Sequence, residues 1–175
     1  MDLGLFIKRS LILKKNSDLN WIIRNTGKLG FHTNLNILLE PIIEDIKKYN
    51  WLIADLEINT SELDKLPINH EKDWFLIGFE EMESIRKTDT QIIWGVFSAI
   101  DKDTKIDISD DILPMAEGIE EIWKNGNLQV TGSKIEIIAW DSSYTIVKFT
   151  DKKLSQQFKD YFDEAIELEK YKWKA

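Results

Sequence analysis

The chain has 175 residues, of which 43% are hydrophobic and 31% are charged, and it contains no cysteine and two histidines. This composition is typical of a globular domain, and the lack of thiols excludes a disulfide framework, a cysteine-ligated metal site and a thiol nucleophile. The formal net charge of −8 disfavours general binding to a phosphate backbone, so no nucleic-acid partner is expected. The length predicts one domain over residues 1–175.

The charge is divided unevenly along the chain. Residues 1–36 carry six basic and two acidic side chains, whereas the rest of the chain carries 17 basic and 29 acidic ones. An acidic body suits a basic protein partner, because complementary electrostatic fields speed encounter and select between partners. Solubility alone is the competing explanation for a negative surface.

The N-terminal segment predicts strands. Residues 3–14 are largely apolar and residues 16–18 are polar, so together with residues 19–23 they predict a β-hairpin closed by an Asn/Asp turn. A helix over residues 3–15 is the alternative, because short apolar runs are ambiguous. Residues 1–30 are therefore expected to be either an N-terminal hairpin or an appendage to the body.

The same apolar run predicts no membrane segment. Lys8 and Arg9 interrupt it, it is too short to span a bilayer, and no cleavage site of small residues follows it. We therefore expect a cytoplasmic protein without a membrane partner. The protein partner that the acidic charge suits is then expected inside the cell as well.

A helix is predicted next, with Thr33 or Asn34 as its N-cap and its end near Lys48. Apolar side chains recur through it at helical spacing, although Pro41 interrupts the pattern and favours a later start. These apolar positions are Leu35, Leu38, Leu39, Ile42, Ile43 and Ile46.

A strand over residues 51–58 carries the first candidate site. In its second half, acidic and apolar side chains alternate. This alternation places Asp55 and Glu57 on one face, and the other face then carries Ala54, Leu56 and Ile58. Two carboxylates on one face are able to act as a general acid and base or to bind a divalent cation. The competing interpretation is that they form the solvent face of an amphipathic strand.

The other predicted elements are separated by polar loops with proline, glycine or asparagine. They are strands over residues 74–77, 91–100, 129–130, 135–140 and 144–149, a short helix over 80–87, and a helix that starts near Asp151. The strand over 91–100 has no charge and is expected to be central. The last helix has an amphipathic stripe formed by Leu154, Phe158, Tyr161, Phe162, Ala165 and Ile166.

Strands and helices do not alternate strictly in this order of elements. The predicted fold is therefore a single α+β domain with a mostly antiparallel sheet. A helix follows its N-terminal segment, and an amphipathic helix lies near its C-terminus.

An acidic connection is the second candidate site. Residues 101–121 hold eight acids and two bases, and Trp123 follows. Acids beside an aromatic anchor favour a protein-binding surface, whereas a solvated loop and a loop folded over the sheet are the alternatives. The candidate partner-binding residues are Asp55, Glu57, Asp110, Asp111, Glu117, Glu120, Glu121, Trp123, Asp141 and Tyr144.

No catalytic motif is complete in the sequence. A phosphate-binding loop, a dinucleotide-binding fingerprint and a serine nucleophile elbow are all missing. His32 and His70 lie in predicted loops without a nucleophile nearby in sequence, which indicates surface or hydrogen-bonded histidines. We expect no enzyme, no cofactor and no metal site.

The C-terminal half carries a family resemblance. The stretches that carry it are residues 49–53, 66–69, 92–100, 122–126, 135–145 and 148–149. They resemble a group of small uncharacterised bacterial proteins, and the resemblance covers about residues 35–170. Proteins of this group are regarded as immunity proteins, which neutralise toxins that competing cells deliver. The resemblance therefore implies a toxin-neutralising role, and it brings no catalytic motif with it.

The leading hypothesis is a non-enzymatic protein that blocks a basic toxin effector domain through its acidic surface. The first alternative is a small carboxylate-dependent hydrolase or metal-binding enzyme that uses Asp55 and Glu57. The second alternative is a structural or oligomeric module whose tryptophan-rich sheet edge associates with another copy. The sequence leaves the oligomeric state open.

Overall fold

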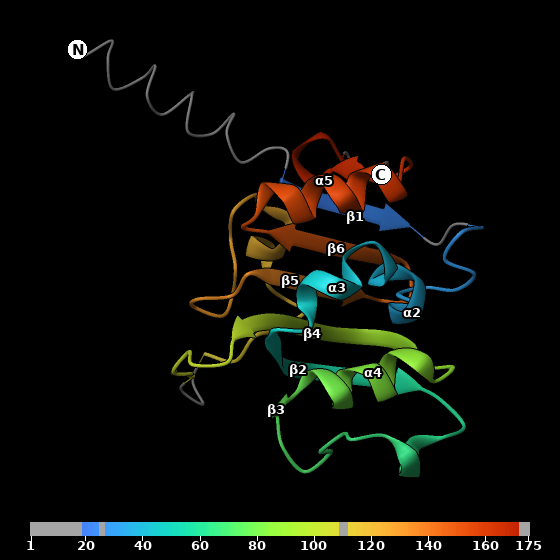
Figure 1. Cartoon of the computed structure of the whole chain (residues 1–175), viewed down its shortest axis with the longest axis vertical. Coiled ribbons are helices and arrows are strands. Elements are labelled where there is room, and N and C mark those ends of the chain that lie inside the picture. Colours follow the sequence, from blue (N-terminus) through green and yellow to red (C-terminus); the bar gives the residue numbers. More distant parts are fainter. Residues whose placement is uncertain (1–18, 25–26, 109–111, 172–175) are drawn as a thin grey trace.

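A computed structural model describes residues 19–24, 27–108 and 112–171. They form a seven-stranded antiparallel sheet with the strand order β3-β2-β4-β5-β6-β1-β7 (Figure 1). The expected α+β class with an antiparallel sheet is confirmed. The strands are β1 (Asn20–Arg24), β2 (Tyr49–Asn59), β3 (Trp74–Ile77), β4 (Gln91–Asp101), β5 (Ile135–Trp140), β6 (Tyr144–Phe149) and β7 (Ile166–Glu167).

The expected N-terminal hairpin falls partly outside the described residues. Its first arm, residues 3–14, lies there, whereas its second arm is β1. β1 pairs with β6 on one side and with β7 on the other, so it belongs to the main sheet.

The helices cover one face of this sheet (Figure 1). They are α2 (Leu35–Leu38), α3 (Ile43–Ile46), α4 (Phe79–Lys87) and α5 (Lys152–Tyr161). The chain also forms short 3-10 turns at Glu40–Ile42, Leu63–Lys65, Glu120–Trp123 and Leu168–Lys170. The main hydrophobic core lies between these helices and the sheet. On the opposite face, an irregular segment between β4 and β5 closes two smaller clusters with Ala116, Ile122 and Val130. No helix within the described ranges is both long and apolar enough to cross a membrane.

The helix expected from residue 34 to Lys48 is broken into three pieces. Asn34 caps the first piece as expected, because its Oδ1 accepts a hydrogen bond from the Asn36 backbone N–H at 3.2 Å. Pro41 then lies in the 3-10 turn, and α3 ends at Ile46. Proline has no N–H for the helical ladder and its ring clashes with the preceding turn, so a continuous helix is not formed.

The C-terminal helix begins as expected but is shorter than its apolar stripe. Asp151 caps it, since its carboxylate accepts from the backbone N–H groups of Lys153 and Leu154. The helix ends at Tyr161, and Ile166 lies instead in β7, opposite Ile22 of β1.

A β-bulge divides β2 and corrects the predicted alternation. The pairing of β2 with β4 shifts between Ala54 and Glu57, and Asp55 has a φ of 52°. Asp tolerates this left-handed conformation better than most residues. Beyond the bulge, Leu56 and Ile58 pack on the helix side, whereas Ala54 packs on the opposite face. The expectation that these three residues share one face is therefore wrong.

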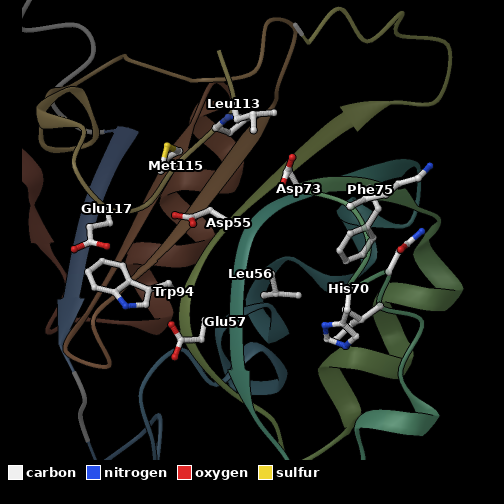
Figure 2. Close-up of a pocket in the computed structure, with 14 residues that line it drawn as sticks. Asp55, Leu56, Glu57, His70, Asp73, Phe75, Trp94, Leu113, Met115 and Glu117 are labelled. Carbon is white, nitrogen blue, oxygen red and sulfur yellow. The ribbon is translucent and has the colours of Figure 1, made fainter. Parts of the chain in front are cut away.

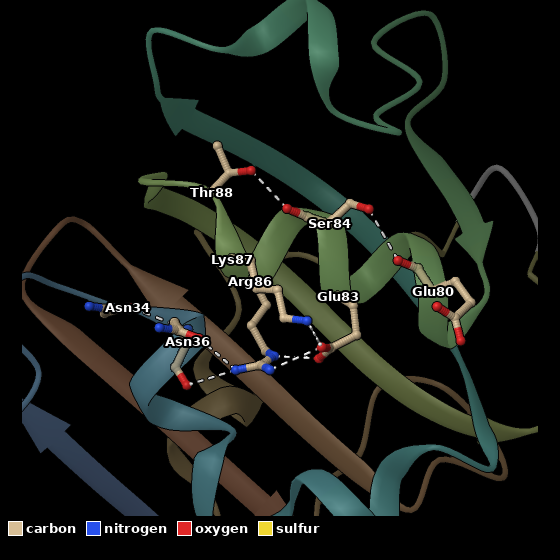
Figure 3. Close-up of polar contacts among 8 residues, drawn as sticks. All are labelled: Asn34, Asn36, Glu80, Glu83, Ser84, Arg86, Lys87 and Thr88. Carbon is tan, nitrogen blue, oxygen red and sulfur yellow. Dashed lines mark hydrogen bonds and ion pairs between the residues drawn. The ribbon is translucent and has the colours of Figure 1, made fainter.

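Arg86 joins α4 to α2 (Figure 3). Its guanidinium donates to the Asn36 side-chain oxygen at 2.6 Å and also binds the Glu83 carboxylate through two nitrogens. The side chains of Arg86 and Glu83 are only 11% and 15% exposed. The hydrogen bond from Arg86 is the main reason that the pKa of Glu83 is lowered to about 2.

We expect Arg86→Met to lower the free energy of unfolding by about 1–3 kcal/mol, because it removes charge-assisted hydrogen bonds that link two helices. Lys87 binds the same carboxylate but is 64% exposed, so Lys87→Met is the matched control and is expected to cost less than about 0.5 kcal/mol. Urea unfolding of both variants measures the difference. Equal effects would contradict the role of Arg86 as the link between α2 and α4.

Candidate partner-binding surface

The bulge in β2 borders a pocket of about 380 Å³ on the sheet (Figure 2). Its walls come from β2, from the loop that leads into β3, and from the stretch 113–117 of the segment between β4 and β5. Residues from distant parts of the chain therefore meet here. The polar side chains that line the pocket are Asp55, Glu57, Asn69, His70, Lys72, Asp73 and Glu117.

Four carboxylates give the pocket its negative charge. Asp55 and Glu57 project from the same side of β2, as expected, whereas Leu56 points the other way (Figure 2). Within the described ranges, no ion pair involves Glu57, Asp73 or Glu117. Because Lys72 is the single base among the lining residues, the pocket favours a cationic group.

Asp55 also has a structural role. Its Oδ2 accepts a hydrogen bond from the Ala116 backbone N–H at 2.7 Å. This bond fixes the stretch 113–117 to the bulge and so places Glu117 beside the pocket (Figure 2). The left-handed backbone of Asp55 therefore serves to position a second acidic segment.

A row of half-buried aromatic side chains adjoins the pocket on the same face. Trp94 lines the pocket and contacts Trp140 edge-on, with ring centroids 5.4 Å apart. Trp140 contacts Trp123 at 5.4 Å and Tyr144 at 5.8 Å, and Tyr144 contacts Tyr171 at 5.6 Å. These five residues, which we call the aromatic row, pack against the buried cluster on the face opposite the helices.

The remaining sequence candidates lie around this surface. Asp141 has a φ of 49° and is exposed in the three-residue turn between β5 and β6, which the Ser142 N–H joins to the Ile93 carbonyl at 3.2 Å. Glu120 and Glu121 are exposed in the 3-10 turn that carries Trp123, and Glu121 pairs with Lys124 at 3.2 Å. Two further candidates lie outside the described residues, namely Asp110 and Asp111.

The structure thus brings together Asp55, Glu57 and Glu117 in the pocket and places Trp123 and Tyr144 in the aromatic row. Sequence reasoning missed Asp73, and it treated Trp94 as an ordinary strand aromatic. Neither residue stands in a motif, and only the β2–β3 and β2–β4 pairings bring them to the pocket.

The histidines differ in their surroundings. His32 is buried, its Nε2 lies 2.8 Å from the Thr33 hydroxyl, and burial lowers its pKa to about 4. His70 is exposed and lines the pocket. In the part of the chain that the structure describes, no group of three or more histidine and carboxylate side chains is arranged to hold a metal ion.

The segment 120–130 is attached to the sheet by a buried ion pair. The strand predicted at residues 129–130 is not formed. The Gln129 N–H instead donates to the Glu136 carboxylate at 2.7 Å, and the Lys148 ammonium donates to the Asn127 carbonyl at 2.6 Å. A side chain therefore takes the place of a strand as the hydrogen-bonding partner of this backbone.

Comparison with protein-family models, with curated proteins and with solved structures finds no match. The expected resemblance of about residues 35–170 to immunity proteins therefore stays a prediction.

Proposed function

We propose that this protein binds and blocks a basic protein partner, as an immunity protein does with a toxin effector domain. The observation that best supports this proposal is the acidic pocket at the β2 bulge and the aromatic row beside it. The row lies on the sheet face that the helices leave uncovered. Aromatic side chains flanked by charges are typical of the energetic centres of protein interfaces. The proposed partner acts in the same cell.

The two parts of the surface have different roles in this proposal. The aromatic row supplies apolar contact area at a small cost in side-chain entropy, since the rings already pack against one another. The carboxylates of Glu57, Asp73 and Glu117 attract lysine and arginine side chains of the partner. These cations then lie close enough to Trp94 for a cation–π contact with its indole ring. Inhibition is then steric and electrostatic, because the bound protein covers a basic active site.

The test is capture of the partner from native cells at low and moderate salt, followed by an assay of the captured protein. We expect one stoichiometric basic partner whose activity falls when the wild-type protein is added. Charge reversal in Glu57→Lys/Glu117→Lys is expected to weaken binding at least tenfold and to flatten its salt dependence, because two attractive charges become repulsive.

Glu44→Lys/Glu80→Lys is the matched control, because both residues are exposed on the helix side and the change in net charge is the same. This control is expected to bind nearly as tightly as the wild type. Equal weakening of binding in both variants would show that the net charge of the protein, and not the pocket, determines the affinity. Unaltered binding by the pocket variant would remove the pocket from the interface, and a partner whose activity is unaffected would contradict inhibition.

A further inference from the structure

Two charged side chains are buried beneath the segment that carries Trp123. Glu136 of β5 and Lys148 of β6 stand directly opposite each other, and their side chains are 0% and 1% exposed. Both lie on the sheet face opposite the helices. Buried ions of this kind are costly unless their hydrogen bonds are complete.

Their hydrogen bonds go to the main chain of the segment 120–130. The Lys148 ammonium donates to the Asn127 carbonyl at 2.6 Å and to the Glu121 carbonyl at 3.4 Å, and Glu136 Oε2 accepts from the Gln129 N–H at 2.7 Å. These contacts do not depend on the side chains of the segment. They therefore hold the 3-10 turn that carries Trp123 regardless of which side chains that turn bears.

The pair is incompletely satisfied. The Lys148 Nζ lies 4.0 Å from Glu136 Oε1, which is too long for a hydrogen bond. Within the described part of the chain, Glu136 Oε1 has no hydrogen-bond partner, and neither has the Ser98 hydroxyl on the strand next to it. The two charges therefore remain close enough to attract each other without recovering all the hydration that burial removed.

The protonation behaviour follows from this burial. Burial raises the pKa of Glu136 to about 7, although Lys148 and the backbone N–H donors oppose the shift. Burial likewise lowers the pKa of Lys148 to about 8, against the attraction of Glu136. The neighbours on the adjacent elements, Ser98, Asn20 and Gln129, are uncharged, and the Glu121 carboxylate pairs with Lys124 at the surface.

We propose that Glu136 and Lys148 are positioning residues whose protonation sets how firmly the segment 120–130, and with it Trp123, is held on the sheet. The role of Trp123 in partner binding rests on the proposed function, whereas the attachment of the segment 120–130 to the sheet is a property of the free protein. When the segment opens, both side chains reach water and regain ordinary proton affinities. Between about pH 4.5 and 7 the closed state then binds a proton at Glu136 that the open state does not, so acid favours closure.

The pH dependence of closure that Lys148 contributes has the opposite sign. Between about pH 8 and 10.5 the open state binds a proton that the closed state does not, so raising the pH favours closure there. The segment is consequently held least firmly near neutral pH, between these two ranges, where both groups are largely charged. A surface ion pair would show neither trend, because its charges stay hydrated in both states.

Hydrogen exchange of the full chain, corrected for intrinsic exchange rates, tests this proposal. Protection of backbone amides in residues 121–130, above all Gln129, is expected to rise at least tenfold from pH 7.5 to pH 5.5. Glu136→Gln is expected to flatten this profile. Asp101→Asn is the matched control, because Asp101 at the end of β4 pairs with Lys134 while 53% exposed. This variant should keep the wild-type profile.

Wild-type protection that is flat or falls towards acid would overturn the proposal, and so would a Glu136→Gln profile that still rises. If the single variant does not fold, the double variant Glu136→Gln/Lys148→Met takes its place. It removes both buried charges and should also give protection that does not change with pH. These outcomes are read in the free protein. They are therefore independent of partner capture, and failure of either experiment leaves the other interpretable.

Discussion

Lys148→Met is expected to lower the free energy of unfolding by about 3–5 kcal/mol at pH 7.5, because removing one member of a buried pair leaves the other without a counter-charge. Glu136 must then stay charged alone or bind a proton at a pH far above its ordinary pKa. The substitution also removes the donor to the Asn127 and Glu121 carbonyls. Urea unfolding followed by tryptophan fluorescence measures this loss.

Two comparisons separate the charge effect from general damage to the core. At pH 5 the cost of Lys148→Met is expected to shrink, because Glu136 is then protonated and no lone charge is buried. Glu136→Gln/Lys148→Met is expected to recover most of the loss at pH 7.5, since both charges are gone. A single variant within about 1 kcal/mol of the wild type at pH 7.5 would contradict the importance of the pair.

Phe158→Ala is expected to lower the free energy of unfolding by about 3–5 kcal/mol, because it empties the centre of the contact between α5 and the sheet. Phe158 is completely buried, and its ring lies 5.5 Å from that of Phe149 and 4.8 Å from that of Phe162. Thermal and urea unfolding check the size of the loss.

Tyr161→Phe is the matched control on the same helix. Its hydroxyl donates to the Glu40 carboxylate at 2.7 Å in an exposed position, so the loss is expected to stay below about 1 kcal/mol. Phe158→Leu should lie between the two, since it keeps part of the buried volume. A Phe158→Ala variant no less stable than Tyr161→Phe would contradict the placement of Phe158 at the centre of this contact.

The regular strands and the start of α5 could be predicted because local patterns determine them. The strand over residues 91–100, the hairpin of residues 135–149 and the cap at Asp151 all follow from hydrophobic runs and turn residues. The breaks were harder to predict. Pro41 predicts an interruption and a later helix start, but not the three pieces that form. The bulge at Asp55 has no sequence signal other than a residue that tolerates a positive φ.

The sequence marks some of the residues that line the pocket, but not how they are arranged. Acidity marked Asp55, Glu57 and Glu117, yet nothing local shows that a residue 60 positions downstream lies beside β2. That contact includes a long-range hydrogen bond from the Ala116 N–H to Asp55 and the burial of Ala116 against Val96. The buried ion pair was missed because glutamate and lysine in adjacent strands are ordinarily expected on the solvent face.

The lengths of the outermost described strands bear on self-association. Among the described strands, the sheet ends in β3, with four residues, and in β7, with two. Outer strands expose unpaired backbone groups, which act as templates for strands of other chains. These two offer few such groups, so the described sheet is poorly suited to growth by strand addition, the route by which β-proteins aggregate into fibres.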